Sequence, residues 1–404
     1  MEESKSKFGH AEFYMTQDEM LEIGRQKSRL FIGVPKETTF QENRVVLVPD
    51  GVELLVRHGH EVIIETGAGE SAHFSDHEYS EAGARIVSSS AEVFKADLIL
   101  KVQPVTMSEM EHMKPRQTLI SALQVGMQRE EYFRGLMQRR VTALAFELIR
   151  DKLDAFPVIR AMSEIAGSTS IFLAAEYLAD GENGKGKMFG GFSGIPPSEV
   201  VIIGAGTVGE FAARSAMGLG ALVKVFDLSV YRLRRLQNNL GTRIFTSILH
   251  HNDILEALKT ADVVIGAIHA KDGKTPCIVS EDMVRQMKEG SVIIDVSIDQ
   301  GGCFETSRPT THKNPVYKVD GITHYCVPNI PSKVPYTASQ ALNNIFVPIL
   351  MQVGAEGGIE NLLKDDYAIR QGVYLYNGIL TNSFISRIFT LPFQDISLLM
   401  ASFH

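Results

Sequence analysis

The sequence lacks the long apolar runs that mark membrane proteins. No uninterrupted apolar stretch reaches the roughly 18 residues that a bilayer-spanning helix needs. The first residues are charged and acidic, without the apolar core segment of a secretory signal. We therefore expect no secretory leader and no membrane partner.

Cysteine is also scarce, and basic residues are not in excess. Cys277, Cys303 and Cys326 are the only cysteines, and their spacing fits neither a metal site nor a disulfide framework. We expect no metal and a reducing, cytoplasmic location. The 40 Lys and Arg residues against 48 Asp and Glu residues give a net charge of −8, which argues against nucleic acid as a main partner.

One stretch, Val200–Asp227, has the pattern strand, tight turn, helix, strand, acid. Gly204, Gly206 and Gly209 have G-x-G-x-x-G spacing directly after an apolar run. In a dinucleotide site the first glycine permits the turn, the second admits the pyrophosphate and the third lets the helix pack on the strand. Asp227 follows Gly209 by 18 residues, close to the roughly 20 expected for an acid that accepts from ribose hydroxyls. This context favours a nucleotide site over a glycine-rich turn that binds nothing.

The 404 residues suffice for two domains of ordinary size. Strand and helix patterns alternate on both sides of residue 157, which is typical of doubly wound sheets. The expected strands include Glu61–Glu65, Arg85–Val87 and Arg243–Phe245, and the expected helices include Glu130–Gln138 and Met162–Leu178. The last 65 or so residues are also expected to be helical. We expect an α/β protein with two Rossmann-type, doubly wound parallel-sheet domains facing a central cleft. The predicted division is an N-terminal arm at 1–29, a substrate domain at 30–156 plus 337–404, and a nucleotide-binding domain at 157–336. The arm has one expected helix, begun by a capping box at Thr16–Glu19.

Polar residues follow several of the expected strands, and carboxyl ends of parallel strands form the usual ligand edge. A single such residue is as readily a surface loop charge. Several at equivalent strand ends are harder to explain by accident, above all the cations Arg44 and Lys101 and the carboxylate Asp299. The whole set is Arg44, Lys101, Gln124, Ser163 and Glu164 (expected to open a long helix), His269, Asp299, Gln300 and Asn329.

Specific segments carry a family resemblance. They include Ile32–Glu37, Asn43–Val45, Met162–Gly167, the glycine motif and Ile298–Glu305, and the match runs from about Leu30 to Val353. The chain resembles the alanine dehydrogenase family and, more distantly, the soluble nucleotide-binding part of proton-translocating transhydrogenase.

The resemblance implies an NAD-dependent amino-acid dehydrogenase that interconverts L-alanine with pyruvate and ammonium, and a homo-oligomer, usually a hexamer. Arg44 and Lys101 would hold the substrate, and Lys101, Asp299 and Gln124 would form the catalytic set. Asp299 would assist proton transfer beside the nicotinamide. The cofactor-binding residues would be Ser163, Gly204, Gly206, Thr207, Val208, Gly209, Asp227, Arg232, Ile268, Asp299 and Asn329.

Gln124 departs from the family pattern. The position after the strand at Thr118–Leu123 typically carries a histidine regarded as an acid/base residue, and transhydrogenase has glutamine there. Glutamine cannot exchange a proton near neutral pH. Two alternatives therefore stay open: a dehydrogenase for another small amino acid, or a dinucleotide-binding module without dehydrogenase turnover.

Overall fold

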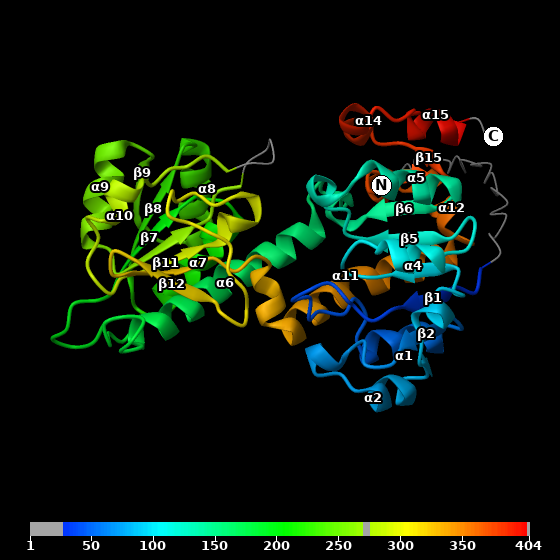
Figure 1. Cartoon of the computed structure of the whole chain (residues 1–404), viewed down its shortest axis with the longest axis horizontal. Helices are drawn as coiled ribbons and strands as arrows, with labels where there is room; N and C mark the ends of the chain where they lie inside the picture. The colour runs from blue at the N-terminus through cyan, green and yellow to red at the C-terminus, as the bar shows by residue number, and fades with distance from the viewer. Residues whose placement is uncertain (1–26, 270–274, 402–404) are drawn as a thin grey trace, which may run out of the picture.

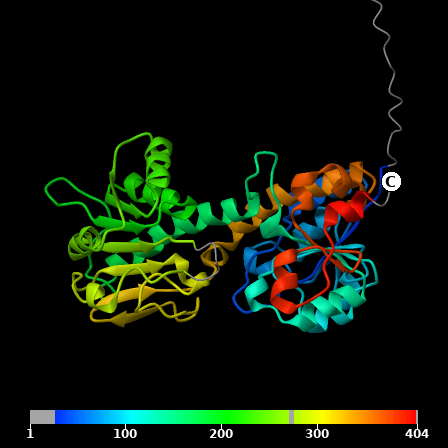
Figure 2. The same ribbon diagram turned by 90° about the horizontal axis from the view of Figure 1, so that it is seen from above.

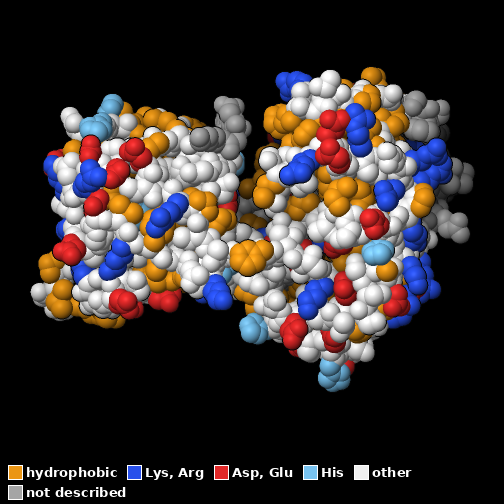
Figure 3. All heavy atoms as spheres, viewed as in Figure 1, with side chains coloured by type: hydrophobic (Ala, Val, Ile, Leu, Met, Phe, Trp, Pro, Cys, Tyr) orange, Lys and Arg blue, Asp and Glu red, His pale blue; other side chains and the backbone are white. Residues whose placement is uncertain are grey.

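The structure, a computed structural model, describes residues 27–269 and 275–401, and the expected helix of the N-terminal arm lies outside them. Figure 1 shows two lobes joined by two long helices, α6 (Pro157–Ala179) and α11 (Pro335–Ala355). The helices run side by side between the lobes in both ribbon views (Figures 1 and 2) and contact each other. In the space-filling view (Figure 3), a furrow separates the lobes above the narrow middle of the molecule, where they join.

Within the described residues the first lobe contains an eight-stranded sheet of order β15-β14-β6-β5-β4-β1-β2-β3. Strands β1 to β6 are parallel, and only β14 and β15 run antiparallel to their neighbours. The strands are β1 (Phe31–Val34), β2 (Glu61–Glu65), β3 (Arg85–Val87), β4 (Leu98–Leu100), β5 (Thr118–Ser121), β6 (Thr142–Ala145), β14 (Val373–Tyr376) and β15 (Ile379–Leu380). The helices are α1 (Pro49–Arg57), α2 (Asp76–Glu81), α3 (Ser90–Val93), α4 (Met107–Glu111), α5 (Glu130–Gln138), α12 (Ile359–Asp365), α13 (Tyr367–Arg370), α14 (Ser383–Phe389) and α15 (Ile396–Ala401).

The described part of the second lobe contains a seven-stranded sheet of order β12-β13-β11-β10-β7-β8-β9. Only β12 is antiparallel to its neighbour. The strands are β7 (Glu199–Ile203), β8 (Leu222–Asp227), β9 (Phe245–Ile248), β10 (Val263–Gly266), β11 (Val292–Asp295), β12 (Val316–Val319) and β13 (Ile322–Tyr325). The helices are α7 (Thr207–Gly218), α8 (Val230–Leu240), α9 (His251–Thr260) and α10 (Glu281–Val284). The predicted fold class, two doubly wound and mostly parallel sheets, is confirmed.

The central strands are apolar on both faces because helices cover each side of a parallel sheet. Each residue of β10 is buried, as are the last four of β7, and each sheet has a separate apolar cluster on either face. The register aligns the strand ends, since Gly266 pairs with both Ile203 and Asp295. The loops that follow β7, β10 and β11 therefore share one edge, and those that follow β1, β4 and β5 share another.

Helix α6 begins earlier than the sequence predicts. Pro157 occupies its first turn, where a missing N–H costs nothing, so the helix starts five residues before Met162. Ser163 and Glu164 consequently lie inside the helix and do not open it, which corrects the prediction. Among the described residues α6 is the one helix long and apolar enough to cross a membrane by length and composition. It packs along α7 and against α11, as a core helix does.

Candidate active site

The loop that follows β1 crosses to the second lobe and brings the two ligand edges together. Asn43 donates from its backbone N to Ser332 Oγ at 2.9 Å and from Nδ2 to Ser332 O at 3.1 Å. Asn329, in the loop after β13, donates from Nδ2 to Glu42 Oε2 at 3.1 Å. Strand-end residues of both sheets therefore meet at the boundary between the lobes.

Arg44 is buried in this loop and is held along one edge of its guanidinium. Glu42 Oε1 accepts from Nε at 2.7 Å, and Oε2 accepts from Nη2 at 2.6 Å. Burial alone would raise the pKa of Glu42, but the charge and hydrogen bonds of Arg44 lower it below its usual value. The Nη1 group donates to the sulfur of Met162 at 3.4 Å. One edge of the guanidinium thus faces α6 and is suited to a small carboxylate.

Lys101 directly follows β4, and its side chain is fully buried. Its Nζ donates to Glu109 Oε1 at 2.7 Å and Oε2 at 2.9 Å. A second carboxylate, Glu37, has Oε2 at 3.7 Å from the same nitrogen. A buried ammonium needs such partners, because an unpaired charge in the interior is costly.

Asp299 lies on the second lobe, in the 3₁₀ turn η4 (Val296–Gln300) that follows β11. Its Oδ1 accepts from the backbone N of Asn329 at 3.0 Å, and its charge interacts with that of Arg44. The side chain keeps access to solvent. The protein around the carboxyl nevertheless removes part of its hydration, and this desolvation raises the pKa of the carboxyl above its usual value. A carboxylate of raised pKa beside a cation can accept and return protons.

Gln124 adopts the left-handed conformation, with φ 48° and ψ 56°, at the end of β5. Its Nε2 donates to Gln103 Oε1 at 2.8 Å, and Gln103 Nε2 donates to Glu42 Oε2 at 2.6 Å. Gln124 is therefore linked to Arg44 through Gln103 and Glu42. It can orient these groups but offers no titrating proton.

The glycine turn has the geometry that a dinucleotide requires. Gly204 has a φ of +116°, and a Cβ there would lie 2.4 Å from Ala267 O. A Cβ on Gly209 would lie 1.9 Å from Gly204 O, so close packing of helix on turn depends on this glycine. At Gly206 a Cβ would meet nothing within 4 Å. Gly206 precedes the twelve-residue helix α7, whose first N–H groups and dipole favour a phosphate anion in this open space.

Asp227 ends β8 beside this turn, and its carboxylate is buried. Oδ2 accepts from the backbone N of Ala205 at 2.7 Å, and Oδ1 accepts from that of Ser229 at 2.7 Å. A carboxylate has about four acceptor sites, so ribose hydroxyls can still bind. Arg232 Nη1 lies 3.8 Å from Oδ2. These residues fit the adenosine end of NAD.

The other predicted cofactor residues lie around α7. Thr207 and Val208 are its first two residues. A Cβ on Gly167 would lie 2.4 Å from Val208 O, so α6 crosses the start of α7 in direct contact. Ser163 is one turn before Gly167 on the same helix face and therefore points toward that site. Ile268, in the loop after β10, donates its N–H to Ser297 Oγ at 2.9 Å.

Sequence reasoning missed the polar residues around the two cations, which are the carboxylates Glu37, Glu42 and Glu109, and Gln103, which bonds to Glu42. Two of them carry a weak signal, since Glu42 and Gln103 each lie two residues from a predicted cation in the chain. Glu109 comes from α4, where it also closes the capping box of Thr106. Only the packing of α4 brings that carboxylate to Lys101.

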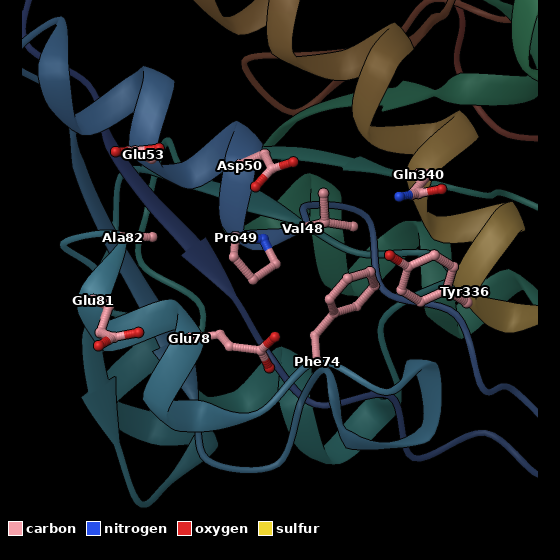
Figure 4. A pocket seen from close by; sticks show the side chains of 10 residues that line it. All are labelled: Val48, Pro49, Asp50, Glu53, Phe74, Glu78, Glu81, Ala82, Tyr336 and Gln340. Carbon is pink, nitrogen blue, oxygen red and sulfur yellow. The ribbon is translucent and has the colours of Figure 1, made fainter.

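The described residues also form a hollow of about 330 Å³ on the first lobe, away from these residues (Figure 4). Phe74 and Tyr336 stack with centroids 4.9 Å apart on one side of it, and carboxylates from α1 and α2 line the other. None of the predicted site residues lines this hollow. Arg44, Asp299 and Asn329 lie at the boundary between the lobes instead.

A glycine turn with dinucleotide geometry on one lobe, and buried cations on the other, are typical of nicotinamide-linked dehydrogenases of small anionic substrates. Comparison with known proteins identifies the family. The N-terminal domain model described as "Alanine dehydrogenase/PNT" matches residues 33–166, and the corresponding C-terminal domain model matches 170–383. The chain belongs to the alanine dehydrogenase/PNT family.

Individual relatives agree over almost their whole length. An alanine dehydrogenase of Staphylococcus saprophyticus is 39% identical over 368 residues, covering 91% of this chain and 99% of the relative. One of Methanococcus maripaludis is 40% identical, covering 90% and 98%. A solved L-alanine dehydrogenase superposes with a TM-score of 0.83 at 39% identity, covering 89% and 99%. A transhydrogenase from Sinorhizobium meliloti, with a TM-score of 0.73 at 23% identity over 87% and 98%, shares the fold.

These comparisons confirm the family resemblance. The chain is an NAD-dependent amino-acid dehydrogenase of this family.

Proposed function

We propose that this chain interconverts L-alanine, water and NAD with pyruvate, ammonium and NADH. The observation that carries the proposal is the interaction of Arg44, from the first lobe, with Asp299, from the second, while Glu37 links Arg44 to the buried Lys101. Arg44 and Lys101 are buried, and the charge of Asp299 interacts with that of Arg44 across the boundary between the lobes. Relatives named alanine dehydrogenase at about 39% identity support the substrate.

Each residue has a distinct role in this proposal. Arg44 pairs with the substrate carboxylate through its free edge, because charge-assisted bonds are strongest. Lys101 polarises the keto oxygen and the oxygen of the carbinolamine. Asp299 accepts and returns the proton of the amine. Gln124 positions the substrate through Gln103 without taking a proton.

The cofactor set supports NAD binding from three directions. The glycine turn and the start of α7, with Thr207 and Val208, hold the pyrophosphate. Asp227 and Arg232 hold the adenosine ribose, and the remaining contacts come from Ser163, Ile268, Asp299 and Asn329. Bound nicotinamide supplies or accepts the hydride, and the residues of the chain hold substrate and protons around it.

The decisive assay is NADH oxidation by the purified wild type with pyruvate and ammonium. We expect NADH oxidation that requires both pyruvate and ammonium. In the reverse assay we expect L-alanine to reduce NAD. Larger 2-oxo acids serve as controls for a different side-chain preference. A protein that binds NADH without aminating any small 2-oxo acid would contradict the proposal.

Cofactor choice provides a second prediction. Asp227 should repel a 2′-phosphate, and like charges in contact cost several kcal/mol, so NADH should exceed NADPH in catalytic efficiency by about 10²-fold or more. Asp227→Asn should lower the ratio of the catalytic efficiency with NADH to that with NADPH. The substitution should also remove one hydrogen bond from the backbone N of Ala205 or Ser229. Equal efficiency of the wild type with both cofactors would remove Asp227 from the ribose site.

One observation favours a second candidate, a dinucleotide-binding module without turnover. Gln124 occupies the place of the family histidine and is engaged by Gln103, so no histidine is supplied at this strand end. The wild-type assay separates the two functions, because the module would bind NADH and leave pyruvate unchanged.

The wider setting is proposed on the resemblance. We propose a cytoplasmic homo-oligomer, a hexamer as is usual in the family, with no membrane or nucleic-acid partner. We also propose residues 30–156 plus 337–404 as the substrate domain and 157–336 as the nucleotide-binding domain. The pairing of β14 with β6 supports the return of the C-terminal segment to the first lobe.

A further inference from the structure

The half of the site on the first lobe contains more carboxylates than cations. Glu37, Glu42 and Glu109 surround Arg44 and Lys101, and every one of these side chains is at most 9% exposed. Fully ionised, the cluster has one negative charge too many. Because water is excluded from these side chains, that excess cannot be screened cheaply.

The pairing identifies the surplus carboxylate. Glu42 makes two short bonds to Arg44, at 2.7 and 2.6 Å. Glu109 makes two to Lys101, at 2.7 and 2.9 Å. Glu37 has no short bond to a cation and lies 3.7 Å from Lys101 Nζ.

Glu37 is nevertheless held firmly beside Lys101. Its Oε1 accepts from the backbone N of Val102 at 2.5 Å, and the N–H of Gln103 lies 3.4 Å from both of its oxygens. The residue belongs to the loop after β1, next to β4 in the sheet. Its carboxyl is thus fixed at the end of β4 with one oxygen toward the ammonium.

The charges around Glu37 explain its proton affinity. Lys101 faces it from the end of β4, Glu42 from its own loop and Glu109 from α4. Burial is the largest influence and outweighs the attraction of Lys101, so the pKa of Glu37 rises to about 7. The carboxyl therefore holds a proton below neutral pH and releases it above.

We propose that Glu37 is the proton-holding group of the reaction, which exchanges its proton with the substrate through Lys101. This inference rests on the proposed function. It assigns to the loop after β1 the acid/base role that Gln124 cannot perform at the end of β5.

The proton transfer balances in the amination direction. When the carbinolamine loses water, its C–O bond breaks and the departing hydroxyl takes a proton from the Lys101 ammonium. The resulting amine takes the proton of Glu37, whose O–H bond breaks and leaves a carboxylate. Ammonium loses its proton to solvent before it attacks pyruvate as ammonia, and solvent returns a proton to Glu37 after the step. In deamination the carboxylate receives the proton that Lys101 takes from the attacking water.

The sign of the pH dependence follows from these states. Amination needs protonated Glu37, so its kcat should fall as pH rises through about 7. Deamination needs the carboxylate, so its kcat should rise through the same pH. Glu37→Gln should remove the pH-dependent limb of the kcat profile in both directions. It should also lower kcat by about 10²-fold, the low end of the effect of a positioned acid or base. Its amide oxygen can still accept from Val102, and NADH affinity should stay unchanged.

Two further variants separate proton exchange from packing. Glu37→Asp keeps a carboxyl and should retain a titrating limb at a shifted pH. Glu65→Gln is the matched control, because Glu65 accepts from the backbone N of Lys36 at 2.9 Å but lies outside the cluster. It should behave as the wild type. A Glu37→Gln enzyme with both limbs and near-normal kcat would overturn the inference.

Infrared difference spectra between pH 6 and 8 test the protonated carboxyl directly. The wild type should show a carboxylic-acid C=O band that titrates, and Glu37→Gln should lack it while Glu65→Gln keeps it. A wild type without the band, or a band that survives in Glu37→Gln, would overturn the inference. Failure of the proposed function is recognised separately, as a wild type that aminates no 2-oxo acid.

Discussion

Asp299→Asn should lower kcat for pyruvate amination by about 10²- to 10⁴-fold, the range typical of a positioned general acid or base. The asparagine oxygen can still accept from the backbone N of Asn329, the bond that Asp299 Oδ1 makes at 3.0 Å. The local fold and NADH binding should therefore survive. Steady-state kinetics together with an NADH titration by fluorescence would measure both properties.

Asp97→Asn is a suitable control for this substitution. Asp97 precedes β4 at the end opposite Lys101, where it pairs with Lys114 at 3.0 Å on the surface. Its loss should leave kcat unchanged. If Asp299→Asn also kept wild-type turnover, the proton would have to pass through another group and Asp299 would leave the catalytic set.

Arg44→Met should raise the KM for pyruvate by about 10²- to 10⁴-fold with little change in NADH affinity. Breaking a buried charge pair costs about 3–5 kcal/mol, and about 1.4 kcal/mol corresponds to a tenfold change in affinity. The substrate carboxylate would lose its partner, whereas the glycine turn lies on the other lobe. The split between pyruvate KM and NADH Kd is the measurement.

Arg44 also neutralises Glu42, so the single substitution should lower the melting temperature. Removal of the cation leaves Glu42 buried and unpaired. The double variant Arg44→Met with Glu42→Gln should recover stability without recovering pyruvate binding. A double variant with normal pyruvate KM would show that Arg44 serves folding and not the substrate.

The sequence predicted the sheet strands well where apolar runs were continuous. Glu61–Glu65 and Arg85–Val87 coincide with β2 and β3, and Glu130–Gln138 coincides with α5. Phe245 was expected to end a strand but begins β9, which is exposed at a sheet edge and has no continuous apolar run. The strands β14 and β15 were missed in a segment expected to be helical, because strands of four and two residues leave little periodicity.

Part of the site was also predicted, because the apolar runs that mark the strands also mark where the strands end. Arg44, Lys101 and Asp299 each follow a strand, and parallel strands present their carboxyl ends on one edge. Where the structure places them agrees with that rule. Their roles stay predictions, as does the cofactor set. The start of α6 was wrong because Pro157 initiates a helix one and a half turns before the apolar periodicity suggests.

The sequence by itself determined the glycine turn, the alternation of strands and helices, and the cations that end the strands. These are local properties, since each depends on residue type and on spacings of a few positions. Only the tertiary structure decided which carboxylate pairs with which cation. Glu109 reaches Lys101 from α4, and Asn329 reaches Glu42 from the other lobe, 287 positions away in the chain. Burial and charge at Glu37 arise from that packing, because proton affinity depends on neighbours that the chain brings together only when it folds.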